Sequence, residues 1–478
     1  MRFLLFYCLT GLLSFQLAAN GSVQEPAKYP RGEIIGPIVS ASAPSQRYAV
    51  YLPSALDPKK PAPILYIMDY RGRGRVAAEV FQAAAEQFGW IIMSSYNTLS
   101  DSEGEPNVLA MKTMWNDSHD MFTIDDQRVY VAGLSGTARL ATLLGRRSSV
   151  KFTGVIGAAA GFHPDVPPSK ETPFLYYGTA GTVDYNYWEM RGVAEKLTRL
   201  GLPHRIAFFD GAHGWMPPDL ATAAVAWMEL RAMQSGDREI DAKVVDERWS
   251  RDLERTRALE ADGSDWEASR LLASMASDYA KLRSADEISE VTRRARQFGS
   301  TAKARSQAHI QAHASARHES RVERAMLIIA DAYPPDAEMP AATVAATVKT
   351  LDLPRLQLTA RGANTEEALA AARVLAELDV QTGLYLPVSA IRSQDYQRAR
   401  FYLGVALAVR SDDAYAWYLR AALDARMRQP DRAIESLERA ISLGFRTVDA
   451  LEQDPSFTSL RQRPEFVRLL NGLRETVR

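Results

Sequence analysis

The two halves of the chain have different patterns of apolar and polar residues. As far as Leu230, short apolar runs alternate with longer segments in which apolar residues recur at helical spacing. The apolar runs predict strands at 48–52, 64–68, 90–93, 128–134, 152–160, 174–177 and 205–209, and the longer segments predict helices at 76–88, 108–121, 187–200 and 221–230. Strands that alternate with helices indicate an α/β domain: a mostly parallel sheet covered by helices on both faces.

The second half is predicted to be entirely helical. The segments 247–261 and 266–298 are charged and rich in alanine and leucine, whereas Pro334, Pro335 and Pro340 would interrupt a helix. Further on, three small or apolar residues recur after 34 residues, Ala399, Leu403 and Ala406 being followed by Ala433, Leu437 and Ala440. This period is typical of tetratricopeptide repeats, which stack as helical hairpins. Such a stack would bind a partner protein, cap the first domain or form a dimer surface.

The start of the chain has the pattern of a secretory signal peptide. Arg2 is followed by an uncharged, mostly apolar run at 3–15 and by the small residues Ala18 and Ala19. The run is shorter than the ~20 apolar residues of a membrane-spanning helix, so an uncleaved anchor is the weaker alternative. We therefore expect an exported protein, periplasmic or secreted, with no membrane span after cleavage. Cys8, the only cysteine, would be removed, which leaves no disulfide and no cysteine metal site.

These patterns predict an order of domains. A signal peptide at 1–19 and an N-terminal arm at 20–45 precede the α/β domain at 46–235. A helical region at 236–345 and tetratricopeptide-like repeats at 346–478 follow it. The polar stretch 236–243 is predicted to be an exposed linker with few contacts across it.

Charge and histidine spacing exclude several classes of function. The chain has 57 Lys and Arg against 58 Asp and Glu, which gives no electrostatic reason to expect nucleic acid or anionic lipid as a partner. His309 and His313 are four residues apart, with His318 nearby, but no H-E-x-x-H signature accompanies them. A solvated helix face is the favoured interpretation, and no metal or cofactor is expected.

The stretch RVYVAGLSGTARLA at 128–141 predicts a strand, a sharp turn and a helix. Gly133 and Gly136 surround Ser135 at the corner, where its hydroxyl would be lifted clear of the sheet beside a helix N-terminus. This is the arrangement of a nucleophile elbow in an α/β-hydrolase. A plain strand-to-helix turn is the alternative if the motif is taken alone.

Two further residues follow predicted strands in the order that an α/β-hydrolase requires. Asp184 comes after the strand at 174–177, and His213 comes after the strand at 205–209. The carboxyl ends of parallel strands meet at one edge, where ligands of such sheets bind. His213 would accept the proton of Ser135, and Asp184 would hold the imidazole in the right tautomer. Asp210 is the competing acid, ranked lower because it shares a short turn with His213.

Other residues near these positions would stabilise an oxyanion or contact a substrate. The backbone N–H of Gly136 is one predicted oxyanion donor, and the second is the N–H of Tyr70 or Arg71, in the loop after the strand at 64–68. The aromatic residues Tyr185, Tyr187 and Trp215 flank the predicted triad. They would form a wall for an acyl or aromatic group, although packing of surface loops explains them equally well.

The segments GLSGTAR, DYNYW and DGAHGW resemble the secreted esterases related to polyhydroxyalkanoate depolymerases and feruloyl esterases. The resemblance covers about residues 45–235 and implies Ser135 as nucleophile, Asp184 as acid and His213 as base. The elbow of that family usually reads G-x-S-G-G, so Thr137 is a departure that puts activity rather than fold in question.

Together these features predict an α/β-hydrolase fold followed by an all-α domain, with a small or polymeric ester as the substrate. The predicted reaction is ester hydrolysis through an acyl-enzyme. A serine peptidase is the nearest alternative, because the same triad cleaves amides. A helical-repeat interaction protein with a degenerate hydrolase domain is the alternative from another class.

Overall fold

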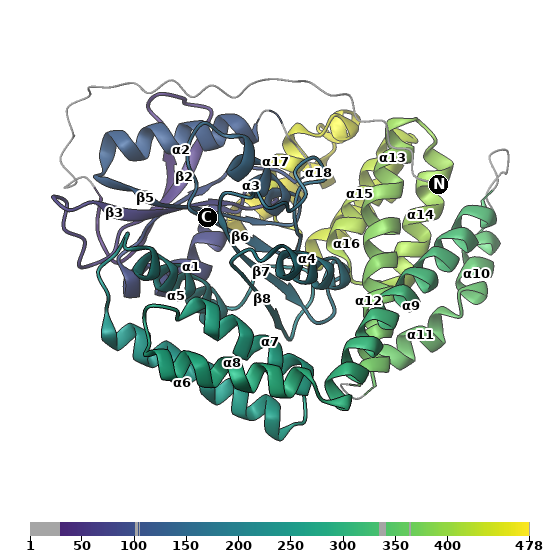
Figure 1. The fold of residues 1–478 in the computed structure, drawn as a ribbon. Coiled ribbons are helices and arrows are strands. Elements are labelled where there is room, and N and C mark those ends of the chain that lie inside the picture. Colours follow the sequence, from purple (N-terminus) through teal and green to yellow (C-terminus); the bar gives the residue numbers. More distant parts are fainter. Residues whose placement is uncertain (1–28, 101–103, 105, 334–340, 363–364, 478) are drawn as a thin grey trace. The chain divides into compact units, whose positions relative to one another are not determined.

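Eight strands form one sheet in the first half of the chain (Figure 1). The structure is a computed structural model that describes residues 29–100, 104, 106–333, 341–362 and 365–477. The strands are β1 (Ile34–Val39), β2 (Arg47–Tyr51), β3 (Ala62–Met68), β4 (Ile91–Ser95), β5 (Ile124–Leu134), β6 (Gly154–Ala158), β7 (Leu175–Gly181) and β8 (His204–Phe209). The predicted signal peptide, with Cys8, lies outside the described residues.

The order of strands in the sheet is β1-β2-β4-β3-β5-β6-β7-β8. β1 and β2 pair antiparallel, as do β2 and β4, and every later pair is parallel. The exchange of β3 and β4 within an otherwise sequential order is the topology of the α/β-hydrolase fold, so the predicted fold class is confirmed. The carboxyl ends of β3, β5, β6, β7 and β8 therefore lie side by side along one side of the sheet, called here its carboxyl edge.

One strand was not predicted. β1 lies within the segment assigned to an N-terminal arm, and its sequence IIGPIV contains Gly36 and Pro37. Both residues normally interrupt strands, and proline lacks the N–H that a ladder needs. β1 accommodates them because it is the edge strand, and its pairing with β2 shifts register between Ile35 and Ile38.

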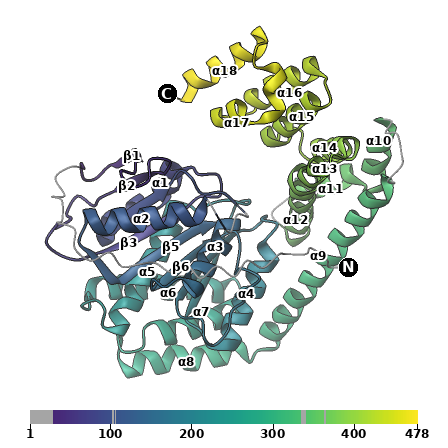
Figure 2. The same cartoon turned by 90° about the horizontal axis from the view of Figure 1, so that it is seen from above.

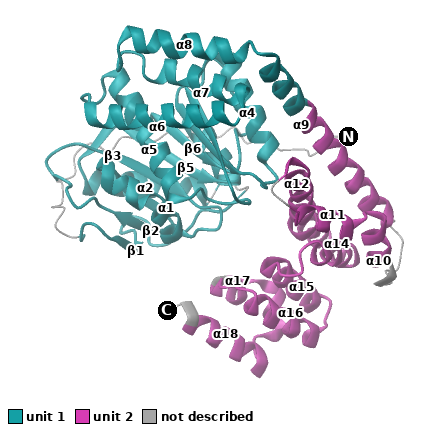
Figure 3. Ribbon diagram, turned by 90° about the horizontal axis from the view of Figure 1, so that it is seen from below, with its two compact units in different colours: residues 1–312 teal, residues 313–478 magenta. Residues whose placement is uncertain are grey.

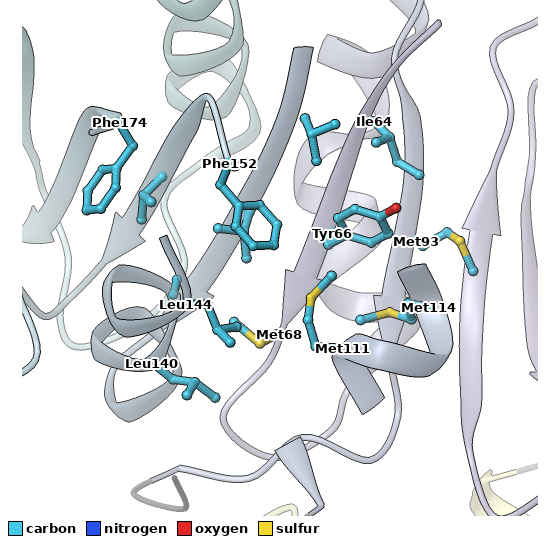
Figure 4. Close-up of a cluster of buried hydrophobic side chains, with 14 of the residues drawn as sticks. Ile64, Tyr66, Met68, Met93, Met111, Met114, Leu140, Leu144, Phe152 and Phe174 are labelled. Carbon is cyan, nitrogen blue, oxygen red and sulfur yellow. The ribbon is translucent and has the colours of Figure 1, made fainter. Parts of the chain in front are cut away.

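Five helices cover the two faces of the sheet: α1 (Gly74–Phe88), α2 (Asn107–Met121), α3 (Gly136–Arg147), α4 (Tyr187–Leu200) and α5 (Pro218–Ser235). Successive residues of a strand point to opposite faces. In β3, Tyr66 packs in the core under α2, α3 and α4, whereas Leu65 and Ile67 pack in the core under α1 and α5. Figure 4 shows the first of these cores, with Met111 and Met114 of α2 and Leu140 and Leu144 of α3 against the sheet.

The α/β part does not end at residue 235. The first compact unit extends to Ala312 and includes α6 (Ala242–Ala261), α7 (Asp265–Asp278) and α8 (Ala285–Gly299), which can be followed beside α5 in Figure 2. The fully buried Leu230 of α5 shares an apolar core with Leu272 and Met275 of α7. The stretch 236–243 is mostly exposed, as predicted, but the boundary placed there falls inside a packed unit.

Ion pairs also join α6 and α7 to the sheet and to α4. Arg205 of β8 bonds to Asp278 through Nε at 2.7 Å and to Asp252 through Nη2 at 3.0 Å. Arg191 of α4 bonds to Glu267 of α7 at 2.6 Å. An unpaired charge in such a position costs several kcal/mol, about 3–5 for a buried pair that loses one member. The expectation of few contacts across 236–243 was wrong because sequence periodicity does not show which surface a helix covers.

The predicted helix at 266–298 is two helices. α7 ends at Asp278 and α8 begins at Ala285, with Lys281 between them in a left-handed conformation at φ 69°. Ser284 caps α8 by accepting the backbone N–H of Glu287, whose side chain in turn accepts the N–H of Ser284. This capping box was present in the sequence as S-x-x-E and marks the start of a helix.

The middle of the sheet is built from glycines that face large side chains. Gly157 of β6 pairs with Gly178 of β7. A Cβ at Gly157 would lie 2.6 Å from the hydroxyl oxygen of Tyr176, and a Cβ at Gly178 would lie 2.5 Å from Cδ1 of Ile206. The missing side chains at these two glycines thus leave space for the side chains of Tyr176 and Ile206, and the Tyr176 ring is fully buried.

The second compact unit, residues 313–478, is helical throughout its described part (Figure 3). The boundary between the units falls within α9 (Ala302–Ala332). The helices after it are α10 (Ala341–Thr350), α11 (Leu353–Ala360), α12 (Glu366–Val380), the π-helix η2 (Gln381–Tyr385), α13 (Leu386–Arg392), α14 (Tyr396–Val409), α15 (Ala414–Arg426), α16 (Pro430–Ser442), α17 (Val448–Gln453), the 3₁₀ helix η3 (Pro455–Leu460) and α18 (Pro464–Val477).

The residues that suggested a repeat lie at matching places in this unit. α14 begins at Tyr396 and α16 begins at Pro430, 34 residues later. All six repeat-defining residues are fully buried, and all but Ala406 belong to one apolar core: Ala399, Leu403, Ala406, Ala433, Leu437 and Ala440. Helices thus occur where the period predicted them, and the assignment to a tetratricopeptide array remains a prediction. Among the described residues, none of the helices combines the length and the apolar character needed to cross a bilayer.

Candidate active site

Ser135 lies at the turn between β5 and α3, as predicted. Its backbone has φ 60° and ψ −126°, a conformation that a residue with a side chain rarely adopts. Its N–H donates to the carbonyl of Ala158 at 2.9 Å, which ties the turn to the end of β6. Gly133 is required two residues earlier, because a Cβ there would lie 2.2 Å from the carbonyl oxygen of Thr137. This is a strained corner of the kind on which a serine nucleophile is presented.

Thr137 braces the corner rather than disturbing it. The side chain is fully buried, and its hydroxyl lies 2.6 Å from the carbonyl of Met68 and accepts the N–H of Leu134 at 3.0 Å. Met68 is the last residue of β3. The Thr137 hydroxyl therefore connects the elbow to the neighbouring strand.

Asp184 and His213 are brought together at the same edge of the sheet. Asp184 follows β7 and His213 follows β8, and Nδ1 of His213 lies 3.0 Å from Oδ1 of Asp184. The same oxygen accepts the N–H of Asn186 at 2.8 Å. Asp184 is fully buried, whereas the competing Asp210 is exposed and lies 3.5 Å from the hydroxyl of Thr182. The carboxylate that faces the histidine is thus Asp184.

The other nitrogen of His213 faces a tyrosine. The hydroxyl of Tyr185 lies 2.9 Å from Nε2, and the two rings stack with centroids 4.2 Å apart. Ser135 is nearly buried, and among the described residues no hydrogen bond joins its hydroxyl to His213. The structure therefore brings Asp184 and His213 into contact and places Ser135 at the same sheet edge, with Tyr185 at the position where a base must meet its nucleophile. Catalytic hydrogen bonds are often long without substrate.

The three predicted oxyanion donors differ in availability. The N–H of Arg71 donates to Oδ1 of Asp69 at 2.9 Å, so it is already used within its own turn. Within the described part of the chain, no acceptor is recorded for the N–H of Tyr70 or of Gly136. Tyr70 lies in the loop after β3, and its ring meets His213 edge-on at 6.4 Å. The amides of Tyr70 and Gly136 therefore remain the candidate pair. The amide of Arg71 is not available to an oxyanion, because it already donates to Asp69.

The predicted aromatic wall is only partly present. Tyr185 lies against His213, but Tyr187 is 5% exposed, packs on Phe208 and accepts hydrogen bonds from Arg191. Placing Tyr187 in a substrate wall was therefore wrong: as the first residue of α4 it turns into the core. Trp215 contacts Phe81 edge-on at 5.7 Å and donates its indole N–H to Asp69.

Asp69 is a residue of this region that the sequence analysis did not single out. It is fully buried directly after β3 and meets both the loop with Tyr70 and the segment with His213. One indication of a role for Asp69 was present in the sequence: it directly follows a predicted parallel strand, and the ligand-binding residues of such sheets lie at the carboxyl ends of the strands.

The three histidines singled out in the sequence, His309, His313 and His318, lie in α9. No group of three or more His, Cys, Asp or Glu side chains in the described residues is arranged to hold an ion. His309 and His313 are exposed, as a solvated face requires, but His318 is buried. Burial, with the charges of Arg373 and Arg321, lowers the pKa of His318 to about 4.

No protein-family model matches this chain, and no curated protein matches it. Among solved structures, it is similar to the S-formylglutathione hydrolase FrmB from Staphylococcus aureus, with 14% identity and a TM-score of 0.33 over 44% of this chain and 99% of that one. It is similar to a ferulic acid esterase with 15% identity and a TM-score of 0.34 over 41% and 96% of the two chains. An esterase from Pyrobaculum calidifontis matches with 14% identity and a TM-score of 0.34 over 43% and 88%. At these identities the likeness concerns the fold alone.

Proposed function

We propose that this protein is a serine hydrolase that cleaves carboxylic esters through an acyl-enzyme. The observation that carries the proposal is the arrangement at the carboxyl edge of the sheet. A strained Ser135 stands at the end of β5, and the buried Asp184 contacts His213 beyond β7 and β8. The resemblance of GLSGTAR and DGAHGW to secreted esterases supports an ester as the substrate.

The reaction assigns one role to each group. The Ser135 hydroxyl oxygen attacks the ester carbonyl carbon while Nε2 of His213 takes its proton. The amides of Gly136 and Tyr70 donate to the negative oxygen of the tetrahedral intermediate. When that intermediate collapses, the C–O bond to the alcohol breaks, and His213 returns the proton to the leaving oxygen. Water then repeats the sequence on the acyl-enzyme, with His213 again as base, and releases the acid and Ser135.

Asp184 supports the imidazole in this scheme. Its Oδ1 contacts Nδ1, which fixes the proton on that nitrogen and leaves Nε2 as the acceptor. Before attack, Nε2 must exchange the hydroxyl of Tyr185 for that of Ser135. Tyr185 is thus proposed to hold the resting histidine until a substrate enters.

The test combines a covalent probe with a comparison of substrates. Wild type is expected to react with a fluorophosphonate and to hydrolyse p-nitrophenyl esters, whereas Ser135→Ala is expected to do neither. Labelling at another residue, or labelling of neither protein, would refute the assignment of the nucleophile. Faster cleavage of peptides than of esters by wild type would favour a peptidase of the same fold.

A further inference from the structure

A buried carboxylate connects two loops of the proposed site. Asp69 is 0% exposed, and its Oδ2 accepts the indole N–H of Trp215 at 2.9 Å and Nη2 of Arg73 at 2.9 Å. Its Oδ1 accepts the backbone N–H groups of Arg71 at 2.9 Å and of Arg73 at 3.2 Å, and Nε of Arg73 at 3.0 Å. Five donors therefore converge on one side chain that water does not reach.

The partners of this carboxylate lie next to groups that the proposed reaction uses. Tyr70, whose N–H is a proposed oxyanion donor, stands between Asp69 and Arg71, and Trp215 comes two residues after His213. The backbone around Tyr70 is also held: the carbonyl of Asp69 accepts the hydroxyl of Thr98 at 2.8 Å, and the carbonyl of Tyr70 accepts the N–H of Ser100 at 2.9 Å. The direction of the Tyr70 N–H is thus set from both sides.

The charge of Asp69 persists over the range in which a histidine base works. Burial by itself would raise the pKa of Asp69, but the hydrogen bonds and charge of Arg73, together with Trp215 and the amide of Arg71, outweigh it and hold the pKa below its ordinary value. Charge-assisted hydrogen bonds of this kind are stronger than neutral ones. Protonation therefore does not release the loops at mildly acidic pH.

We infer that Asp69 is a positioning residue of the proposed ester hydrolysis, whose carboxylate fixes the Tyr70 amide relative to His213. The inference rests on the proposed function. An oxyanion donor is needed at the position of the charged oxygen rather than of the ground-state carbonyl, so misplacing it raises the barrier without weakening substrate binding. The loss should thus fall on kcat and leave KM nearly unchanged.

The most selective variant is Trp215→Phe. It removes the N–H that reaches Asp69 and keeps a ring against Phe81. We expect kcat for a p-nitrophenyl ester to fall roughly tenfold and KM to stay within about twofold. Asp69→Asn keeps one acceptor oxygen but loses the negative charge that pairs with Arg73. For this variant we expect kcat to fall roughly a hundredfold.

A matched control exists elsewhere in the same unit. The indole N–H of Trp90 donates to the buried Glu229 at 2.6 Å, and Trp90 precedes β4 at the opposite edge of the sheet. Trp90→Phe removes the same kind of bond, so it should lower the melting temperature and leave kcat unchanged. A slower enzyme in Trp215→Phe but not in Trp90→Phe would show that the effect is local to the site.

Each other outcome has a defined meaning. If Trp215→Phe folds and keeps the wild-type kcat, the inference is overturned, and this variant decides the question even if Asp69→Asn fails to fold. A rise in KM with unchanged kcat would also overturn it, because Trp215 would then bind substrate. An inactive wild type that does not react with a fluorophosphonate overturns the proposed function together with this inference, whereas an active wild type with unaffected variants overturns the inference alone.

Discussion

The hydroxyl of Thr137 offers the clearest way to separate the stability of the elbow from its activity. Thr137→Val keeps the volume and the branched shape but removes the group that bonds to Met68 and Leu134. A buried backbone group left without its partner costs about 1–3 kcal/mol. In a unit of this size each kcal/mol of lost stability lowers the melting temperature by about 2–4 °C, so we expect a decrease of roughly 2–12 °C.

The same substitution should slow the reaction. The hydroxyl ties the turn of Ser135 to the last residue of β3, directly before the loop with Tyr70. Without it the nucleophile and the proposed oxyanion donor are no longer held together, and we expect kcat to fall roughly tenfold. Thr137→Ser keeps the hydroxyl and should retain most of both properties.

Thr142 provides the matched control for this experiment. It lies in the same helix α3, is fully buried, donates to the carbonyl of Arg139 at 2.7 Å and accepts the N–H of His163 at 2.9 Å. Thr142→Val should therefore reduce the melting temperature by a similar amount and leave kcat unchanged. Two results would refute this account. In the first, Thr137→Val has the same melting temperature as Thr137→Ser and the kcat of wild type. In the second, Thr142→Val lowers kcat as much as Thr137→Val does.

Three further predictions follow from other contacts. Asp184→Asn should fold and lose up to ~10⁴ in kcat, whereas Asp210→Asn should lose little; steady-state ester kinetics in which the second variant is the slower one would reassign the acid. Burial, partly offset by the charge of Arg410, raises the pKa of Asp379 from its ordinary 3.8 to about 6. The folded state therefore binds this proton more tightly than the unfolded state. The resulting stabilisation is complete below pH 3.8 and is lost as the pH rises through 6. Asp379→Asn should then stabilise the second unit by roughly 2 kcal/mol at pH 8 but not at pH 4 in urea titrations, and equal shifts at both values would contradict this. A chain that ends after Ser235 lacks α6–α8 and exposes the apolar side chains of Leu230 and Met233 that pack against them, so it should be insoluble; a soluble product with a cooperative melt would show that α6–α8 are dispensable.

The strands and the order of the triad could be predicted because each depends on neighbours in the sequence. A buried parallel strand is apolar on both faces, and the chain must turn where it ends, so polar residues such as Asp184 and His213 are marked by position alone. The capping box at Ser284 was equally local, and it would have divided the predicted helix at 266–298.

The remaining features depend on contacts between distant residues. Asp69 and Trp215 are far apart in the chain, and nothing in either segment indicates that they meet. The same is true of Arg205 and Asp278, whose pairing places α7 in the first unit. Arg71 and Tyr187 failed as site residues for a related reason, since the direction of a backbone N–H or of a side chain in a loop is set by packing.

The paired glycines in the middle of the sheet limit how this protein can change. Because Gly157 sits beneath the Tyr176 hydroxyl, a larger residue there is tolerated only with a smaller one at 176. Neither change is favourable alone, since the first overpacks the core and the second leaves a cavity. Homologues with this sheet should therefore exchange the two positions together, and a library that varies both at once should yield folded variants that single substitutions would never reach.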